Sequence, residues 1–248
     1  NDFRNQVGKG KAVGVSFKEI DWTLSGAQQN QAAKALGTVM ARVEDGAFDP
    51  NRPQDYYFVT TESNKDPKAT SPAAPTMKRD GGALWKLTFN DIANPRAGGQ
   101  ITMLLDGSEA PFLNKPDNIT IDRSGNLLIQ EDPGNNEQVS RLFAYRLSDG
   151  KIATVAKFKD DYFAPTGKQL ITLDEESSGI VDATDLLRKG ESDKNSYYVF
   201  DAQIHVTADK ARLDLMGNTA VADALNGAVE GGQIYVMTVP DWNAVYAS

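Results

Sequence analysis

The chain has 248 residues, and its 34 Asp and Glu outnumber its 26 Lys and Arg, which gives a formal net charge of −8. That acidity, without any run of Lys and Arg, predicts that nucleic acid is not a partner. The absence of cysteine excludes disulfides, thiolate zinc sites and cysteine nucleophiles from these residues. No apolar stretch approaches the roughly 18 residues of a membrane-spanning helix, so we expect no membrane span.

Taken in chain order, short β runs broken by Gly, Pro, Asn and Asp dominate the sequence. The main exception is Ser25–Val43, where good helix formers follow a Ser cap and predict a helix. Residues 62–80, rich in Ser and Pro, are predicted to be a loop inserted between paired strands, and Thr219–Ala224 is predicted to be a short helix. The predicted strands are Val13–Phe17, Tyr56–Thr61, Leu84–Phe89, Ile101–Leu105, Ile119–Ile121, Leu127–Gln130, Arg141–Arg146, Ala153–Phe158, Gln169–Leu173, Tyr197–Asp201, Ile204–Val206 and Gln233–Val239.

This pattern predicts an all-β fold with a few short helical insertions. About twelve strands make about three four-stranded blades of a β-propeller. The sequence opens without Met and shows no signal peptide, so we expect it to be a processed or cut part of a longer precursor. Turns rich in Asn, such as Asn135-Asn136, are typical of extracytoplasmic proteins. We therefore expect a secreted, periplasmic or cell-surface location.

An acidic phrase occurs twice, each time ahead of a β-rich strand. The first copy, residues 43–61, begins Val-Glu-Asp-Gly-Ala-Phe-Asp-Pro and ends Tyr-Tyr-Phe-Val-Thr-Thr. The second copy, residues 116–132, begins Pro-Asp-Asn-Ile-Thr-Ile-Asp and ends Gly-Asn-Leu-Leu-Ile-Gln-Glu-Asp. Such a repeat suggests a radial β architecture with acidic groups at equivalent corners, where they can converge on a metal.

The first copy places Glu44 and Asp45 beside each other, before a bend at Gly46. Hard cations such as calcium take several carboxylate and carbonyl oxygens, and adjacent acids on a turn can supply them. The alternative is that Asp45 caps the turn while Glu44 is solvated. Arg42 can pair with Glu44 or contact a phosphate oxygen of a substrate.

The second copy places Asp117 before one strand and Asp132 after the next. A hairpin of this length returns both ends to one edge of the sheet, so the two carboxylates can approach each other. Asn118 can give an amide oxygen to calcium or cap a turn. Glu131 points to the opposite side of the strand and is expected to be solvated. Asp122 is interpreted as part of a hairpin turn.

Two later residues are weaker candidates. Residues 175–179 read Glu-Glu-Ser-Ser-Gly and lack the Gly-x-Ser-x-Gly pattern of a nucleophile elbow. Glu176 there fits a bond to the backbone or to a neighbouring blade, with a metal role as the alternative. His205 is the only histidine, which excludes a zinc site built from several histidines. It is interpreted as structural, or as a contact to metal or phosphate beside Asp201.

With these motifs in hand, the chain resembles the C-terminal part of bacterial PhoX-type alkaline phosphatases, a family of large calcium-dependent β-propellers. The Glu-Asp-Gly and Glu-Ser-Ser-Gly phrases are fairly specific, whereas Pro-Asp-x-x-x-x-Asp-x-x-Gly-Asn occurs in many propellers. The resemblance runs over most of residues 40–240. The stretches that carry it are 43–50, 55–61, 115–132, 174–180, 201–205 and 230–233.

The resemblance implies that residues 1–248 form a single region, the C-terminal portion of a roughly six-bladed propeller. It implies that Glu44, Asp117 and Asp132 bind metals over the central channel, with calcium as the main cofactor and iron as a second candidate. Further ligands are expected upstream of Asn1. We therefore expect the N-terminal remainder of the precursor as a partner, or self-association of this part.

The function that follows is a metal-dependent phosphoester hydrolase acting on a small phosphoester substrate. The metal candidates are Glu44, Asp117 and Asp132, then Asp45, Asn118 and Glu176, and the candidates for substrate contact are Arg42 and His205. Two alternatives stay open. One is a non-catalytic, calcium-stabilised propeller that acts as a cell-surface or matrix binding module. The other is a lactonase-like propeller hydrolase, for which the Pro-Asp phrase alone would suffice.

Overall fold

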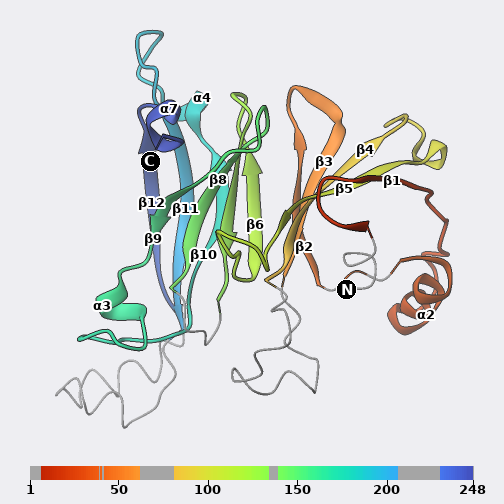
Figure 1. Ribbon diagram of the computed structural model, residues 1–248, viewed down its shortest axis with the longest axis horizontal. Helices are drawn as coiled ribbons and strands as arrows, with labels where there is room; N and C mark the ends of the chain where they lie inside the picture. Colours follow the sequence, from red (N-terminus) through yellow and green to blue (C-terminus); the bar gives the residue numbers. More distant parts are fainter. Residues whose placement is uncertain are drawn as a thin grey trace. The chain divides into compact units, whose positions relative to one another are not determined.

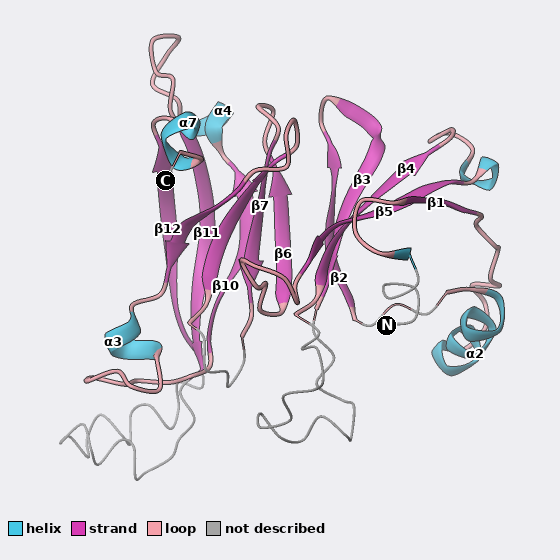
Figure 2. Ribbon diagram, in the orientation of Figure 1, coloured by secondary structure: helices cyan, strands magenta, loops and turns pink. Residues whose placement is uncertain are grey.

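The computed structural model describes residues 7–38, 40, 42–61, 81–133, 139–205 and 230–247. In these residues the chain is mostly β, with strands β1 to β12 in three antiparallel sheets and a few short helices (Figures 1 and 2). The all-β prediction is confirmed. The predicted loop 62–80, the Asn135-Asn136 turn and the short helix Thr219–Ala224 lie outside the described residues. The chain divides into two compact units, Asn1–Pro116 and Asp117–Ser248.

The first unit is built on one five-stranded sheet with the strand order β1-β5-β4-β3-β2. Its only long helix among the described residues, α2 (Gly26–Leu36), starts at the predicted Ser cap, where Ser25 and Gln28 form a reciprocal capping box. The helix ends at Gly37, earlier than predicted, because glycine is a poor helix former. The strands are β1 (Ala12–Val15), β2 (Val43–Asp49), β3 (Arg52–Thr60), β4 (Ala83–Phe89) and β5 (Gly99–Asp106), and a 3₁₀ turn spans Pro95–Ala97.

Alternate residues of the central strands form the core of this unit. Phe58 stacks on Trp85 with ring centroids 6.3 Å apart, and Met103 packs in the same cluster. The indole nitrogen of Trp85 donates to the Thr60 hydroxyl at 3.0 Å, so its polar atom is satisfied inside the sheet. One strand of this unit was not predicted. β2 contains the acids of the first motif, which were expected on a turn.

The second unit contains two sheets, with strand orders β6-β7-β8-β9 and β10-β11-β12. The predicted strand Arg141–Arg146 matches β8, whereas Gln169–Leu173 forms no strand. The first sheet consists of β6 (Pro116–Ile121), β7 (Asn126–Glu131), β8 (Arg141–Arg146) and β9 (Ile152–Lys157). The second consists of β10 (Glu175–Asp182), β11 (Ser196–His205) and β12 (Glu230–Val239), and the short helices are α3 (Asp160–Phe163), α4 (Thr184–Leu187) and α7 (Trp242–Val245).

Side chains of both sheets meet in the core of the second unit. Leu128 and Leu142 of one sheet pack with Tyr198 of the other, and all three are buried. The fully buried Gln130 joins the sheets by hydrogen bonds, because its amide accepts from the Ile180 backbone N–H at 3.0 Å and donates to the Ser178 carbonyl at 3.3 Å. The position of β10 against β7 is therefore fixed by a polar side chain as well as by apolar packing.

The hairpin between β6 and β7 is tied to the rest of this unit through Asp122. Its carboxylate accepts from the backbone and side chain of Asn126, both at 2.8 Å, and from the Tyr198 hydroxyl at 2.6 Å. The Tyr246 hydroxyl, at the end of α7, donates to Asn126 at 3.1 Å. The predicted turn at Asp122 is thus present, and its role is structural. Across the described ranges, we find no helix with the length and apolar character needed to cross a membrane.

Candidate functional site

Three acids that the sequence singled out interact in the second unit. Asp117 lies at the start of β6, Asp132 follows the end of β7, and Glu176 lies in the edge strand β10. Asp132 shares a side-chain hydrogen bond with Glu176, and both Asp132 and Asp117 act on the Glu176 carboxyl by charge. The structure therefore brings together the two acids that flank the second motif and the acid of the Glu-Glu-Ser-Ser-Gly phrase.

The Glu176 carboxyl keeps its proton at pH values where an ordinary glutamic acid has lost it. Its side chain is only 16% exposed. Burial first, and then the Asp132 and Asp117 carboxylates, raise the pKa of Glu176 from 4.5 to about 8. At neutral pH a proton thus holds the Glu176 and Asp132 carboxyls together, where two bare charges would repel each other.

A fourth carboxyl, that of Glu175, is 1% exposed and was not predicted to matter. Its Oε1 accepts from the Ser140 backbone N–H at 2.7 Å, whereas its Oε2 is buried without a hydrogen-bond partner in the described residues. Burial raises the pKa of Glu175 to about 7, and the neighbouring Asp174 and Asp132 act in the same direction. A strand predicted over residues 175–182 would have indicated that Glu175 is buried, because alternation along a strand turns its side chain inward.

Asn118 uses its amide oxygen to hold a bulge in β10. The Oδ1 atom accepts from the Ser178 hydroxyl at 2.8 Å and from the Gly179 backbone N–H at 3.4 Å. The pairing of β10 with β11 shifts register between Ser178 and Val181, and Gly179 has a φ of 62°. A bulge of this kind re-aims the side chains around it. Asn118 thus positions the strand that carries Glu176.

His205 lies beside the same acids. Its Nε2 is 3.6 Å from Oε1 of Glu176, and its side chain is 29% exposed. Its backbone N–H donates to the Asp174 carbonyl at 3.0 Å, which extends the β10–β11 pairing by one residue. The end of β11 thereby adds an imidazole to the edge of the acidic cluster.

Glu131, expected in solvent, is completely buried. Arg141 binds it with two charge-assisted hydrogen bonds, from Nε to Oε2 and from Nη2 to Oε1, both at 2.9 Å. The expectation failed because both faces of β7 are covered, so alternation along this strand does not separate buried from solvated positions. The Glu131 carboxylate therefore forms a structural ion pair with Arg141 and is not part of the acidic cluster.

The acids of the first motif lie in a bulge of β2. The pairing with β3 shifts register between Val43 and Gly46, so Glu44 and Asp45 occupy the irregular part. Arg42 donates to Glu44 at 3.1 Å, which is the pairing alternative of the sequence prediction. Asp45 accepts from the Gly46 backbone N–H at 2.7 Å. These residues belong to the first unit, and their convergence with Asp117 and Asp132 stays a prediction.

The chemistry of the acidic cluster suits a hard cation. Asp117, Asp132 and Glu176 offer carboxylate oxygens, the ligands that calcium prefers. A cation would replace the proton that now holds Asp132 and Glu176 together. In the part of the chain that the structure describes, however, no three or more His, Asp and Glu side chains have the spacing of a metal site. The donors fit the metal by type, and the described residues alone do not complete its coordination.

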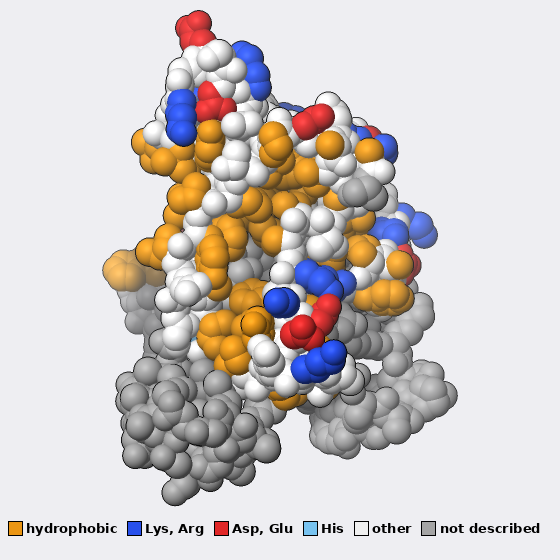
Figure 3. Space-filling model, turned by 90° about the vertical axis from the view of Figure 1, so that its left-hand side faces the viewer, with side chains coloured by type: hydrophobic (Ala, Val, Ile, Leu, Met, Phe, Trp, Pro, Cys, Tyr) orange, Lys and Arg blue, Asp and Glu red, His pale blue; other side chains and the backbone are white. Residues whose placement is uncertain are grey.

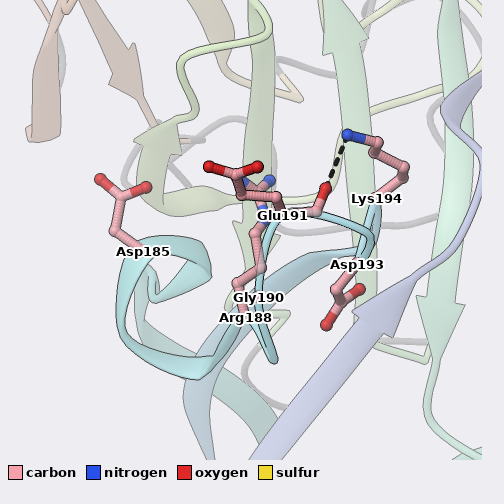
Figure 4. Close-up of a pocket in the computed structure, with 6 residues that line it drawn as sticks. All are labelled: Asp185, Arg188, Gly190, Glu191, Asp193 and Lys194. Atoms are coloured by element: carbon pink, nitrogen blue, oxygen red, sulfur yellow. Dashed lines mark hydrogen bonds between the residues drawn. The ribbon is translucent and has the colours of Figure 1, made fainter.

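Apart from the acidic cluster, a pocket of about 600 Å³ lined by charged side chains lies on the loop between α4 and β11 (Figure 4). Asp193, which is part of it, accepts from the Lys189 backbone N–H and the Tyr197 hydroxyl, so its carboxylate shapes the loop. Lys194 donates to the Glu191 carbonyl at 2.7 Å. None of the predicted site residues line this pocket. Its walls are Asp185, Arg188, Gly190, Glu191, Asp193 and Lys194.

Comparison with known proteins gives one family. The model of the family described as Alkaline phosphatase PhoX matches residues 8–186. Among solved structures, the chain is similar to PhoX of Pseudomonas fluorescens in complex with vanadate, described as a transition state analogue. That similarity has a TM-score of 0.47 and 15% sequence identity, and it covers 70% of this chain and 31% of that chain. No curated protein matches the chain.

Proposed function

Because the chain belongs to the alkaline phosphatase PhoX family, we propose that it forms part of a metal-dependent phosphoester hydrolase. The observation that supports the proposal is the carboxyl cluster of Asp117, Asp132 and Glu176, because the family resemblance implies that two of its members, Asp117 and Asp132, are metal ligands. The substrate would be a small phosphoester. The chain spans about a third of the length of the solved family structure to which it is similar, so the complete site needs further residues.

Asp117, Asp132 and Glu176 would hold the metal in the second unit, and Glu44, with Asp45 as a weaker candidate, would do so in the first. Calcium fits these oxygen donors, with iron as the second candidate. The bound metal would contact phosphate oxygens, neutralise charge in the transition state and activate the attacking oxygen.

The surrounding residues prepare the cluster for this task. The Asn118 side chain fixes the β10 bulge next to Glu176. Glu176 releases its proton only as the pH rises through about 8, and a carboxyl must be deprotonated to bind a metal well. Metal affinity would therefore increase from neutral to mildly alkaline pH. His205 is placed to contact a substrate oxygen at the edge of the cluster, whereas Arg42 is engaged with Glu44.

We further propose that the three sheets are blades of a larger β-propeller, completed by the N-terminal remainder of the precursor or by self-association. The proposed location is secreted or periplasmic. The antiparallel sheets and the family membership support the architecture. An exposed sheet edge such as that of β12 favours a covering partner, because unpaired strand edges promote association.

The decisive experiment combines metal analysis of the natively purified protein with hydrolysis of p-nitrophenyl phosphate, with and without a chelator. We expect bound calcium or iron and chelator-sensitive turnover. Asp117→Asn, Asp132→Asn and Glu44→Gln should each lower turnover and metal content, whereas Glu191→Gln, on an exposed loop, should change neither. Turnover that is insensitive to the chelator would contradict the proposal.

The alternative to catalysis is a metal that only joins parts of a larger fold. Stoichiometric calcium without turnover of p-nitrophenyl phosphate would favour this calcium-stabilised binding module. Turnover of a lactone without any turnover of the phosphoester would favour the lactonase-like hydrolase.

A further inference from the structure

A groove of about 850 Å³ opens between the two sheets of the second unit, next to α3. This inter-sheet groove is lined on one side by β10, β11 and β12 and on the other by β8, β9 and the segment around α3. Figure 3, which looks at this side, shows hydrophobic side chains gathered in a band, with Lys and Arg and also Asp and Glu side chains beside its lower part. The volume lies within the range of small-molecule pockets, about 300–1,000 Å³.

The first wall is one face of the β10-β11-β12 sheet. Ser177, Ala202 and Gln233 pair across the three strands and line the groove. Ile204 pairs with Gly231 in the next row on the same face. Residues directly opposite each other in an antiparallel pair point to the same side, so a side chain at position 231 would enter the groove.

The second wall is mostly aromatic and aliphatic. Phe158 and Phe163 meet edge to face with ring centroids 5.2 Å apart, and Leu142 of β8 continues the apolar surface. The first wall is also apolar there, because Phe200 stacks on Tyr235 with ring centroids 5.7 Å apart. Apolar surface on both walls favours an apolar body in the groove.

Among the described residues, the charged side chains that line the groove are cationic. They are Arg141, Lys157 and Lys159. Arg141 pairs with Glu131 and Lys157 pairs with Asp160. Lys159 lies over the Tyr162 ring at 5.0 Å and has no carboxylate partner in the described residues. The rim therefore offers at least one uncompensated cation to an anionic group.

One polar side chain of the β10 wall borders the groove. Ser177 is 5% exposed and lines the groove, so its hydroxyl can donate to a ligand oxygen. Ser177 and Glu176 are neighbours on opposite faces of β10, whereas Glu175 lies on the same face as Ser177 and accepts a hydrogen bond from Ser140, which lines the groove.

We propose that the inter-sheet groove binds an amphiphilic anion, namely a single alkyl chain that ends in a carboxylate. The chain lies between the aromatic walls, and the carboxylate meets the Lys159 ammonium and the Ser177 hydroxyl. This site is independent of the proposed phosphoester hydrolysis. The cationic side chains that line the groove and its apolar walls distinguish such a ligand from a neutral or cationic one.

The test is calorimetric titration of the full 248-residue chain with dodecanoate below its micelle concentration. The key variant is Gly231→Val. A Cβ at Gly231 would lie 3.7 Å from the Ile204 Cβ, an ordinary contact, so the added side chain fills the groove without forcing the strand. Gly232→Val is the matched control. The Gly232 backbone also borders the groove, but its Cβ would lie 3.8 Å from the Ala202 carbonyl oxygen and the added side chain would point to the other face of β12.

We expect Gly231→Val to abolish dodecanoate binding and Gly232→Val to retain it. Lys159→Glu should weaken binding by roughly threefold to tenfold, as for an exposed charge pair, whereas Lys189→Glu, exposed on another loop, should not. Ser177→Ala should weaken it about tenfold, because the hydroxyl donates to a charged oxygen.

Three outcomes would overturn the proposal. The first is equal affinity for dodecanoate and for dodecyltrimethylammonium, which matches its chain length with the opposite charge. The second is equal binding by the two glycine variants. The third is a dimer, seen by sedimentation, that Gly231→Val dissociates and dodecanoate does not displace, because a second copy of the chain would then be the occupant of the groove.

Discussion

The carboxyl groups of Asp132 and Glu176 share a hydrogen bond, although one follows β7 and the other lies in β10 of a different sheet. Folding thus brings two acidic side chains together, and the Glu176 carboxyl keeps its proton so that the hydrogen bond can form. The bulge that Asn118 holds and the amide contacts of Gln130 place β10 for this encounter. The pair therefore reports both on the joining of the two sheets and on the candidate metal site.

The first prediction concerns the pH dependence of stability. The pKa of Glu176 is about 8 in the folded chain, against 4.5 for an ordinary glutamic acid. Between these values the folded chain keeps a proton that the unfolded chain has lost, so the free energy of unfolding falls as the pH rises. The check is urea unfolding of the metal-free protein, with a chelator present, at pH 5 and pH 8.

Glu176→Gln should reduce this loss of stability, because an amide does not ionise. Part of the slope should remain, since the pKa of Glu175 is raised to about 7 and contributes with the same sign. Glu191→Gln, on an exposed loop, serves as the control and should keep the wild-type slope. An unchanged slope in Glu176→Gln would show that the shared proton is not at this pair.

The second prediction is that Glu131→Ala destabilises the fold by about 3–5 kcal/mol, because it breaks the buried ion pair of Glu131 with Arg141. Glu131 is fully buried and the Arg141 side chain is 19% exposed. The measurement is the midpoint of urea unfolding. Glu19→Ala is the control, since the Glu19–Arg96 pair has both side chains 78% exposed and should contribute little. A similar loss in both variants would argue against a special role for the buried pair.

Much of the fold followed from local sequence signals. The Ser25 cap, the Asp122 turn and strand β8 were all predictable because turn and cap residues act through their own neighbours. The sequence singled out the acids of the site, and in the structure Asp132 and Asp117 both act on the Glu176 carboxyl. Their role as metal ligands stays a prediction.

What the sequence could not supply was the covering of each strand by the rest of the fold. Glu131 looked solvated because alternation assumes one wet face, whereas β7 is buried on both faces. The acids of residues 43–49 were expected on a turn, and residues 175–182 were not predicted to be a strand, because acids and Gly are rare in strands. Both segments contain bulges, which depend on the register with the partner strand.

The third prediction concerns a close approach of two backbone segments in the first unit. A Cβ at Gly107 would lie 2.2 Å from the Gly81 carbonyl oxygen and 2.8 Å from that of Gly82. Gly107→Ala must therefore displace backbone, and it should destabilise the unit by about 1–3 kcal/mol, as overpacking does. Gly14→Ala, where a Cβ would meet nothing within 4 Å, should have little effect. Thermal unfolding of both variants is the test, and equal melting temperatures would contradict the prediction.

The last prediction separates a buried hydrogen bond from an otherwise similar exposed one. The Tyr198 hydroxyl donates to Asp122 at 2.6 Å, and Asp122 is 3% exposed. Burial, together with the Asp122 charge, raises the pKa of Tyr198 well above its usual range. Tyr198→Phe should therefore cost about 1–3 kcal/mol, because Asp122 loses a donor that water cannot replace.

The neighbouring Tyr197 provides the matched control, since its hydroxyl donates at 2.8 Å to Asp193 on a solvent-facing loop. Asp193 also accepts from the backbone N–H groups of Lys189 and Asn195, and water can reach it. Tyr197→Phe should consequently cost less than Tyr198→Phe in urea unfolding. If the two losses were equal, burial of the acceptor would not govern the strength of these tyrosine–aspartate bonds, and Asp122 could not be the tie between the hairpin and β11.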